Sequence, residues 1–177
     1  MTVFWTKGYE GASLSDLTEA MGINRPSLYA AYGNKEELFR KVLERYGEGP
    51  SSYERKALAQ PTAREVAEGL LRGAAHVQTD PSTPAGCLAT LGTTYCAEAS
   101  SPVGKMLIAS RLAGHAAIRE RLEHARGVGD LPADAEPKAL THYLGTVVCG
   151  MAVLAASGAT RNELERVIEL TMRAWPQ

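Results

Sequence analysis

The chain has 177 residues, of which 45% are hydrophobic and 22% charged, and its formal net charge at pH 7 is −1. This length and apolar content suit one compact unit, or a small domain joined to a larger one, and they exclude intrinsic disorder. The balanced charge gives no general attraction to nucleic acid. No run of about 18 apolar residues occurs, and no basic start precedes an apolar segment. We therefore expect no membrane span, no secretory signal and a cytoplasmic location.

Residues 13–38, with the sequence SLSDLTEAMGINRPSLYAAYGNKEEL, predict two short helices joined by a tight turn and followed by a third helix. Ser13 and Asp16 have the spacing of a capping box, in which a hydroxyl and a carboxylate satisfy free amides of the first turn. Gly22 ends the first of these helices because glycine adopts the left-handed conformation at little cost. Asn24 then caps the second helix. This order is typical of a helix-turn-helix that binds DNA.

The second helix of such a unit lies in the major groove, with its N-terminal residues towards the base edges. We therefore predict base contacts from Asn24, Arg25, Pro26 and Ser27. The guanidinium of Arg25 is suited to a bidentate contact with guanine. Phosphate contacts are predicted for polar side chains near helix N-termini, which offer free amides to anions: Ser13, Tyr29, Tyr32 and Lys35. Two alternatives stay open, namely a helical hairpin within a bundle and, for Tyr32, simple packing against Leu38.

The third helix is predicted to begin after Asn34, with Glu37 at the capping-box position, and to continue to Tyr46. Residues 47–62 are rich in Gly, Ser and Pro around a short charged segment, and we predict a connection there. The chain is thereby divided into an N-terminal domain at 1–46 and a larger C-terminal domain at 47–177.

The run GYEGASLSDLTEAMGINRPSLYAAYGNKEELF resembles the DNA-binding domain of the TetR/AcrR family of one-component transcriptional regulators, and the resemblance covers residues 4–46. Residues 85–93, AGCLATLGT, and the ending ASGATRNELERVIELTMRAW are similar to one large branch of that family. The resemblance implies a helix-turn-helix domain followed by an all-α ligand-binding and dimerisation domain. Family members normally carry most of an additional helix before the position of Phe4, so we expect a truncated first helix.

The C-terminal part shows helical periodicity and no strand-period segment, which predicts an all-α fold. Helices are predicted at about 62–78, 87–99, 102–126, 137–157 and from Thr160 to Trp175. Thr160 and Glu163 form a second capping-box pattern. The last two helices carry apolar residues at alternating three- and four-residue steps: Leu140, Leu144 and Val147, then Leu164, Val167 and Ile168.

A helix-turn-helix reads one half-site, so specific binding of double-stranded DNA normally requires a symmetric dimer. We predict a homodimer through the apolar residues of the last two helices, with Gly145 and Gly150 allowing close approach. The alternative is that these residues pack only within their own chain.

A regulator of this type needs a cavity whose occupation changes the spacing of the two DNA-reading helices. Polar and apolar side chains on the middle helices predict a mainly apolar effector site: Tyr95, Met106, Leu112, His115, His142, Tyr143 and Met151. The alternative is that the methionines fill the core and that each histidine is simply hydrogen-bonded.

Cys87 follows Gly86 at a predicted helix start, where the helix dipole favours a reactive thiolate that senses electrophiles or oxidants. A buried, unreactive thiol is the alternative for Cys87, Cys96 and Cys149 alike. The sequence lacks a CxxC, an HExxH, a phosphate-binding glycine loop and a nucleophile elbow, and its four histidines lack metal-ligand spacing. We therefore expect no metal, no cofactor and no catalytic activity.

Two functions remain at this point. The first is a ligand-responsive repressor that binds a palindromic operator as a homodimer and releases it when a small molecule binds. The second is a helical dimer that binds a ligand or a protein partner without competent DNA binding.

Overall fold

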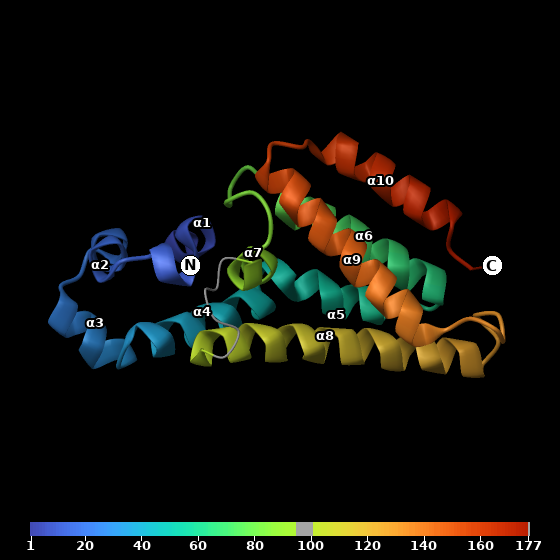
Figure 1. Cartoon of the computed structure of the whole chain (residues 1–177), viewed down its shortest axis with the longest axis horizontal. Helices are drawn as coiled ribbons and strands as arrows, with labels where there is room; N and C mark the ends of the chain where they lie inside the picture. Colours follow the sequence, from blue (N-terminus) through green and yellow to red (C-terminus); the bar gives the residue numbers. More distant parts are fainter. Residues whose placement is uncertain (95–100, 177) are drawn as a thin grey trace.

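The computed structural model describes residues 1–94 and 101–176, and all regular secondary structure within this part is helical, as predicted (Figure 1). The helices are α1 (Thr2–Gly11), α2 (Leu14–Met21), α3 (Arg25–Tyr32), α4 (Lys35–Glu48), the 3-10 helix η1 (Pro50–Ser52), α5 (Tyr53–Leu58), α6 (Ala63–Gln78), α7 (Leu88–Thr94), α8 (Pro102–Gly127), α9 (Pro137–Ala156) and α10 (Arg161–Arg173). The predicted site residue Tyr95 and the third cysteine, Cys96, lie outside the described residues.

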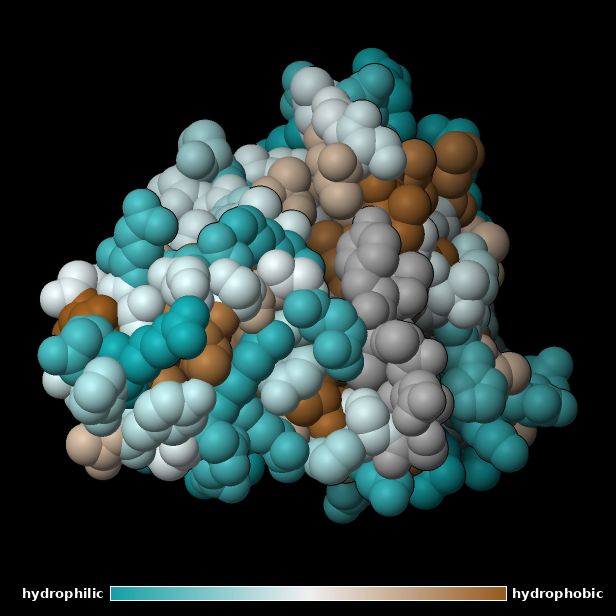
Figure 2. Space-filling view, turned by 60° about the vertical axis from the view of Figure 1, so that its left-hand side comes forward, coloured by the Kyte–Doolittle hydropathy of each residue, from teal (hydrophilic) through white to brown (hydrophobic). Residues whose placement is uncertain are grey.

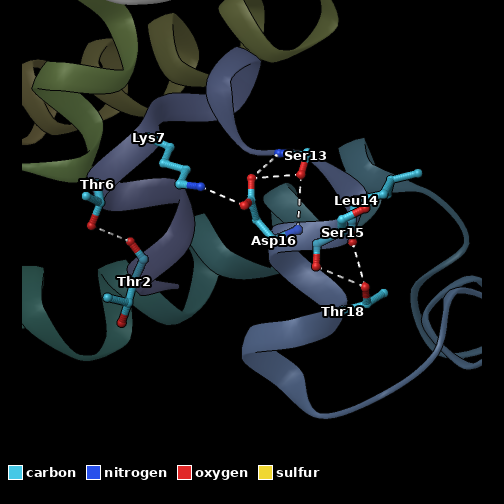
Figure 3. A network of polar contacts seen from close by, with 8 residues as sticks. All are labelled: Thr2, Thr6, Lys7, Ser13, Leu14, Ser15, Asp16 and Thr18. Atoms are coloured by element: carbon cyan, nitrogen blue, oxygen red, sulfur yellow. Dashed lines mark hydrogen bonds and ion pairs between the residues drawn. The ribbon is translucent and has the colours of Figure 1, made fainter.

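Local capping explains why the N-terminal helices begin and end where they do. Asp16 N–H donates to the Ser13 hydroxyl at 3.0 Å and Asp16 Oδ2 accepts from Ser13 N–H at 2.9 Å, which is the predicted capping box (Figure 3). Hydrogen bonds from Lys7 and Ser13 lower the pKa of Asp16 to about 2. Gly22 has the left-handed φ of 65° that ends α2, and Asn24 caps α3. These predictions are confirmed.

One prediction of this kind is wrong. Asn34 caps α4 by accepting from the Glu37 N–H at 2.7 Å, but the Glu37 carboxylate does not return to the Asn34 backbone. It binds the guanidinium of Arg40 one turn later instead. An i,i+3 ion pair on the helix surface competes successfully with the reciprocal cap at this position.

The first helix packs against α4 through aromatic side chains. Residues 2–11 form α1, with a kink at Gly8, where φ is 68°. Phe4 is 1% exposed and meets the ring of Phe39 edge-on, with the centroids 5.0 Å apart. Phe39 also contacts Tyr9 at 5.2 Å. The residues present here therefore form a helix that supports the N-terminal domain through aromatic packing.

The larger core lies between α6, α9 and α10, and α8 runs along the opposite side of α9 (Figure 1). Its fully buried residues include Leu71, Leu144, Leu164 and Ile168. The capping box of Thr160 and Glu163 starts α10, as predicted.

The segment at 47–62 is more ordered than predicted. It contains η1 and α5, and α5 packs closely along α6. The contact is close because Gly69 leaves room: a Cβ there would lie 3.1 Å from Cβ of Ala57. A six-residue helix is too short to produce a recognisable apolar period in the sequence, so its stability derives from this packing.

The predicted dimer seam is partly wrong. Leu144, Leu164 and Ile168 are at most 1% exposed, because they face the core of their own chain. Leu140, Val147 and Val167 are partly buried against the same core. Helix periodicity identifies one apolar stripe but not which of two apolar faces meets solvent.

Helix α9 is apolar on both faces. With 20 residues and a mean hydropathy of 1.6, it is long and apolar enough to span a membrane by length and composition alone, which the sequence did not lead us to expect. In the structure α9 packs against α6, α8 and α10. Its outward residues Tyr143, Val153 and Leu154 are 39%, 50% and 46% exposed. Exposed apolar patches of this kind often mark surfaces through which proteins associate.

Candidate DNA-reading helix and ligand cavity

The N-terminal end of α3 presents the predicted base-reading side chains to solvent. Arg25, Pro26 and Ser27 are exposed, and only Leu28 of this turn is buried, at 0% exposure. Asn24 is also exposed, but its side-chain oxygen accepts from the Ser27 N–H at 2.8 Å. Asn24 therefore shapes the helix start, while Arg25 and Ser27 remain available at the surface.

Arg25 is held in place by a residue that the sequence did not single out. Its guanidinium donates to the hydroxyl of Ser15, on α2, at 2.9 Å. Ser15 is exposed and begins the outer face of α2. A neutral hydroxyl orients the guanidinium without neutralising its charge, so the positive charge stays available to a guanine or a phosphate.

The four predicted phosphate contacts differ in accessibility. Tyr29 is 44% exposed, whereas Tyr32 is half-buried and packs against the N-terminal core. The Ser13 hydroxyl is engaged with Asp16. Lys35 lies over the ring of Tyr9, with Nζ 4.4 Å from the centroid, and burial lowers its pKa. Tyr29 is thus the most freely placed of the four.

The surface of this domain is polar. Figure 2 brings the N-terminal helices forward and shows hydrophilic residues with isolated hydrophobic ones among them. Several charges there are already paired: Lys7 with Asp16, and Arg40 with Glu37 and Glu44. Arg25 forms none of these ion pairs.

A cavity of about 260 Å³ lies where α4, α5, α8 and α9 meet. Residues from both predicted domains form its wall: Leu43, Tyr46, Gly47, Ser51, Tyr53, Glu54, Arg55, Leu70, Cys87, Ala89, Thr90, Ser110, Arg111, Gly114, His115, Ile118, Leu144, Gly145, Val148 and Cys149. The cavity is therefore a mainly apolar space with a few convergent polar groups, as is usual for small-molecule sites.

Of the predicted effector residues that the structure describes, only His115 lines this cavity. Its ring sits over Gly145, where a Cβ would lie 2.7 Å from Nε2. Burial, with His142 and Arg111 nearby, lowers the pKa of His115. The others are placed elsewhere: Met151 is in the core, Met106 packs on the N-terminal core, and Leu112, His142 and Tyr143 are exposed.

Two tyrosines and one glutamate in the cavity wall were missed by the sequence. Tyr53 and Glu54 lie on α5, which was not predicted as a helix. Tyr46 lies on α4, and its hydroxyl donates to the Cys87 sulfur at 3.3 Å. Burial is the main cause of the raised pKa of all three groups.

The cavity adjoins the N-terminal helices. Tyr46 meets the ring of Trp5, on α1, edge-on at 5.0 Å. Helix α1 also packs against α7, which begins directly after Cys87. The N-terminal core itself includes Leu88 and Val103 from the C-terminal region. Tyr46 and Cys87 therefore lie in, or directly precede, helices that pack against the N-terminal core.

Comparison with known proteins identifies the family. The family model described as "Bacterial regulatory proteins, tetR family" matches residues 1–42. Over its whole length the chain is 31% identical to the HTH-type transcriptional repressor ComR of Escherichia coli (strain K12), and it covers 85% of that protein.

Two solved structures agree with this result. A cysteine mutant of the TetR family transcriptional regulator CifR, in complex with 26-base-pair operator DNA, is 41% identical, with a TM-score of 0.92 over 99% of this chain and 92% of that one. A putative TetR transcriptional regulator from Rhodococcus sp. RHA1 is 40% identical, with a TM-score of 0.69 over 98% and 93%. The chain described here belongs to the TetR family of transcriptional regulators.

Proposed function

We propose that this chain is a ligand-responsive repressor: two copies bind a palindromic operator, and a small molecule in the cavity releases it. As a member of a regulator family, the chain is not an enzyme. The main support for the proposal is that both domains contribute residues to the wall of the cavity. Tyr46 lines it and belongs to α4, the helix that begins directly after the DNA-reading unit. The operator complex of CifR supports the DNA-binding part.

The test is fluorescence anisotropy with a labelled duplex that covers the DNA upstream of the gene for this chain. The purified chain should bind this duplex more tightly than a scrambled duplex of equal length and composition. Equal affinity for both duplexes, over a range of salt concentrations, would reject the repressor function.

The homodimer is proposed to form through the outward face of α9 and α10. Tyr143, Val153 and Leu154 lie on one side of α9, and Leu170 of α10 is 64% exposed. Gly150 lies between them on the same helix face, and a Cβ there would meet nothing within 4 Å. An apolar face with a small residue at its centre permits close approach of a second copy.

Replacing Leu154 with glutamate should therefore shift the chain from dimer to monomer, because it places a charge in the centre of an apolar interface. Light scattering coupled to size exclusion measures the mass directly. Val128→Glu is the control, since Val128 is 66% exposed but follows the end of α8. An unchanged dimer mass for Leu154→Glu would show that the copies associate elsewhere.

Cys87 is proposed as a sensing thiol. Its support is its position in the cavity wall and the hydrogen bond that it accepts from Tyr46. Alkylation would replace the thiol hydrogen of Cys87 with a bulky group, which would crowd α4 and push the Tyr46 hydroxyl away from the sulfur. N-ethylmaleimide should therefore release operator DNA from the wild-type chain, and a Cys87→Ser variant should resist release. Equal release from both proteins would end the proposal.

A Cys149→Ser variant is the matched control, because Cys149 lines the same cavity from α9. It should remain sensitive to N-ethylmaleimide if the Tyr46 contact is the relevant one. If Cys149→Ser resists N-ethylmaleimide while Cys87→Ser stays sensitive, the reactive thiol is Cys149 on α9.

A further inference from the structure

We infer that the effector of this cavity is a small apolar molecule with one protonated nitrogen, which the Glu54 carboxylate receives. The inference rests on the proposed function, since it concerns the same cavity, and it specifies the chemistry of the ligand.

In the part of the chain that the structure describes, only one oxygen of the Glu54 carboxylate accepts a hydrogen bond from a protein donor. Its Oε1 accepts from the Ser51 hydroxyl at 2.8 Å. Its Oε2 points across the cavity wall towards α8, where a Cβ added to Gly114 would lie 3.7 Å away. Within the described residues no Lys, Arg or His nitrogen lies within 4.0 Å of this carboxylate. An acidic group in a cavity wall therefore lacks a counter-ion, and a ligand can supply one.

The surroundings of Glu54 are consistent with a missing cation. Burial raises the pKa of Glu54, as expected for a carboxyl that has left water without gaining a positive partner. The nearby hydroxyls of Tyr46 and Tyr53 have raised pKa values, so they stay neutral at physiological pH. A carboxylate beside two aromatic rings is a favourable setting for an ammonium group, because rings attract cations as well.

The positively charged residues of the cavity wall do not remove the preference for a cationic ligand. Arg55 and Arg111 are exposed, so water solvates their guanidinium groups. His115 has a lowered pKa because of burial and the nearby His142 and Arg111, which favours its neutral form. Glu54 is therefore the half-buried ionisable group of the cavity wall whose charge gains most from a ligand of opposite sign.

The volume limits the size of the ligand. A cavity of about 260 Å³ exceeds a site of about 150 Å³ that holds benzene and falls just below the range of about 300–1,000 Å³ for drug-sized ligands. One or two fused rings with a short side chain fit this space.

The test is isothermal titration calorimetry on the full chain with two sets of matched probes. The first set is 2-phenylethylamine, 2-phenylethanol and 3-phenylpropionate, and the second is tryptamine, tryptophol and indole-3-acetate. At pH 7.5 the better amine should bind at least about tenfold more tightly than its alcohol, and the acids should bind more weakly than the alcohols. Glu54→Gln should abolish the preference for the amine while leaving the affinity for the alcohol unchanged. Glu48→Gln, at an exposed position on α4, should change neither.

The pH dependence gives a second readout. Protonation of Glu54 removes the charge that pairs with the amine, so the affinity for the amine should fall as the pH is lowered through the raised pKa of this group. The affinity of the alcohol should not follow this change.

Three results would overturn the inference: equal or tighter binding of the alcohols or acids, an amine preference that persists in Glu54→Gln, or no binding by either amine. Operator binding, measured by anisotropy on the same samples, separates the two proposals. A chain that binds operator but not the amines rejects only the ligand assignment. A chain that binds the amines but no operator rejects only the repressor function.

Discussion

Replacing Phe39 with alanine is expected to lower the free energy of unfolding by about 3–5 kcal/mol. Phe39 is 0% exposed and lies at the centre of the N-terminal core. Its ring contacts Phe4 and Tyr9 of α1, so its removal leaves a cavity between α1 and α4. Urea denaturation followed by circular dichroism measures the loss.

Tyr29→Ala is the matched control for this prediction. It also removes an aromatic ring from the N-terminal domain, but Tyr29 is 44% exposed. Its effect on the free energy of unfolding should stay below about 1 kcal/mol. A similar small loss for Phe39→Ala would show that α1 does not depend on this ring for its position on α4.

Replacing Arg25 with alanine is expected to weaken operator binding by about 1–3 kcal/mol per half-site. Arg25 opens α3, is exposed, and is oriented by the hydroxyl of Ser15. The loss should be concentrated in the specific complex, because Arg25 is predicted to contact a base edge. Anisotropy titrations with the operator duplex and with a scrambled duplex measure the two affinities separately.

Lys35→Ala and Arg40→Ala provide the comparison. Lys35 is expected to contact a phosphate, so its removal should weaken both duplexes alike. Arg40 is bound by Glu37 and Glu44 on the surface of α4, and its removal should change neither affinity. Equal losses from the specific and non-specific complexes of Arg25→Ala would contradict base reading by this residue.

The parts of the fold that local chemistry determines were predictable from the sequence. The caps at Ser13, Asn24 and Thr160 depend on side chains and amides a few residues apart, and the structure has all three. Gly22 is similar, because its left-handed φ is a property of a single residue. Local hydrogen bonds of this kind leave a direct signature in the order of residues.

The cavity was not predictable in the same way. Glu54 lies on a helix that exists through packing of Ala57 against Gly69 of α6, a contact that no local pattern reveals. Tyr143 was placed in the cavity by prediction, but it is 39% exposed and does not line the cavity, while Gly145 and Cys149 of the same helix do. His142 is exposed as well, and its ring lies 6.2 Å from that of the cavity residue His115. Because α9 is apolar on both faces, its hydrophobic pattern does not specify its rotation about its own axis.

The dimer prediction erred for the same reason. Leu144 and Ile168 belong to the stripe that the sequence displays most clearly, and that stripe is the core. The outward residues Leu154 and Leu170 are fewer and are interrupted by small and polar residues. The apolar face that α6 covers is the core face, and the other face is exposed. The sequence does not reveal where α6 lies.

Two copies of α3 are proposed to read the half-sites of a specific, symmetric DNA sequence. The most direct measurement is selection of duplexes from a random pool by the purified chain, followed by sequencing of the bound fraction. We expect enrichment of an inverted repeat with two half-sites, and loss of this enrichment in the Arg25→Ala variant while weak non-specific binding persists. A bound fraction with no enriched motif, or with a motif that is unchanged in Arg25→Ala, would contradict it.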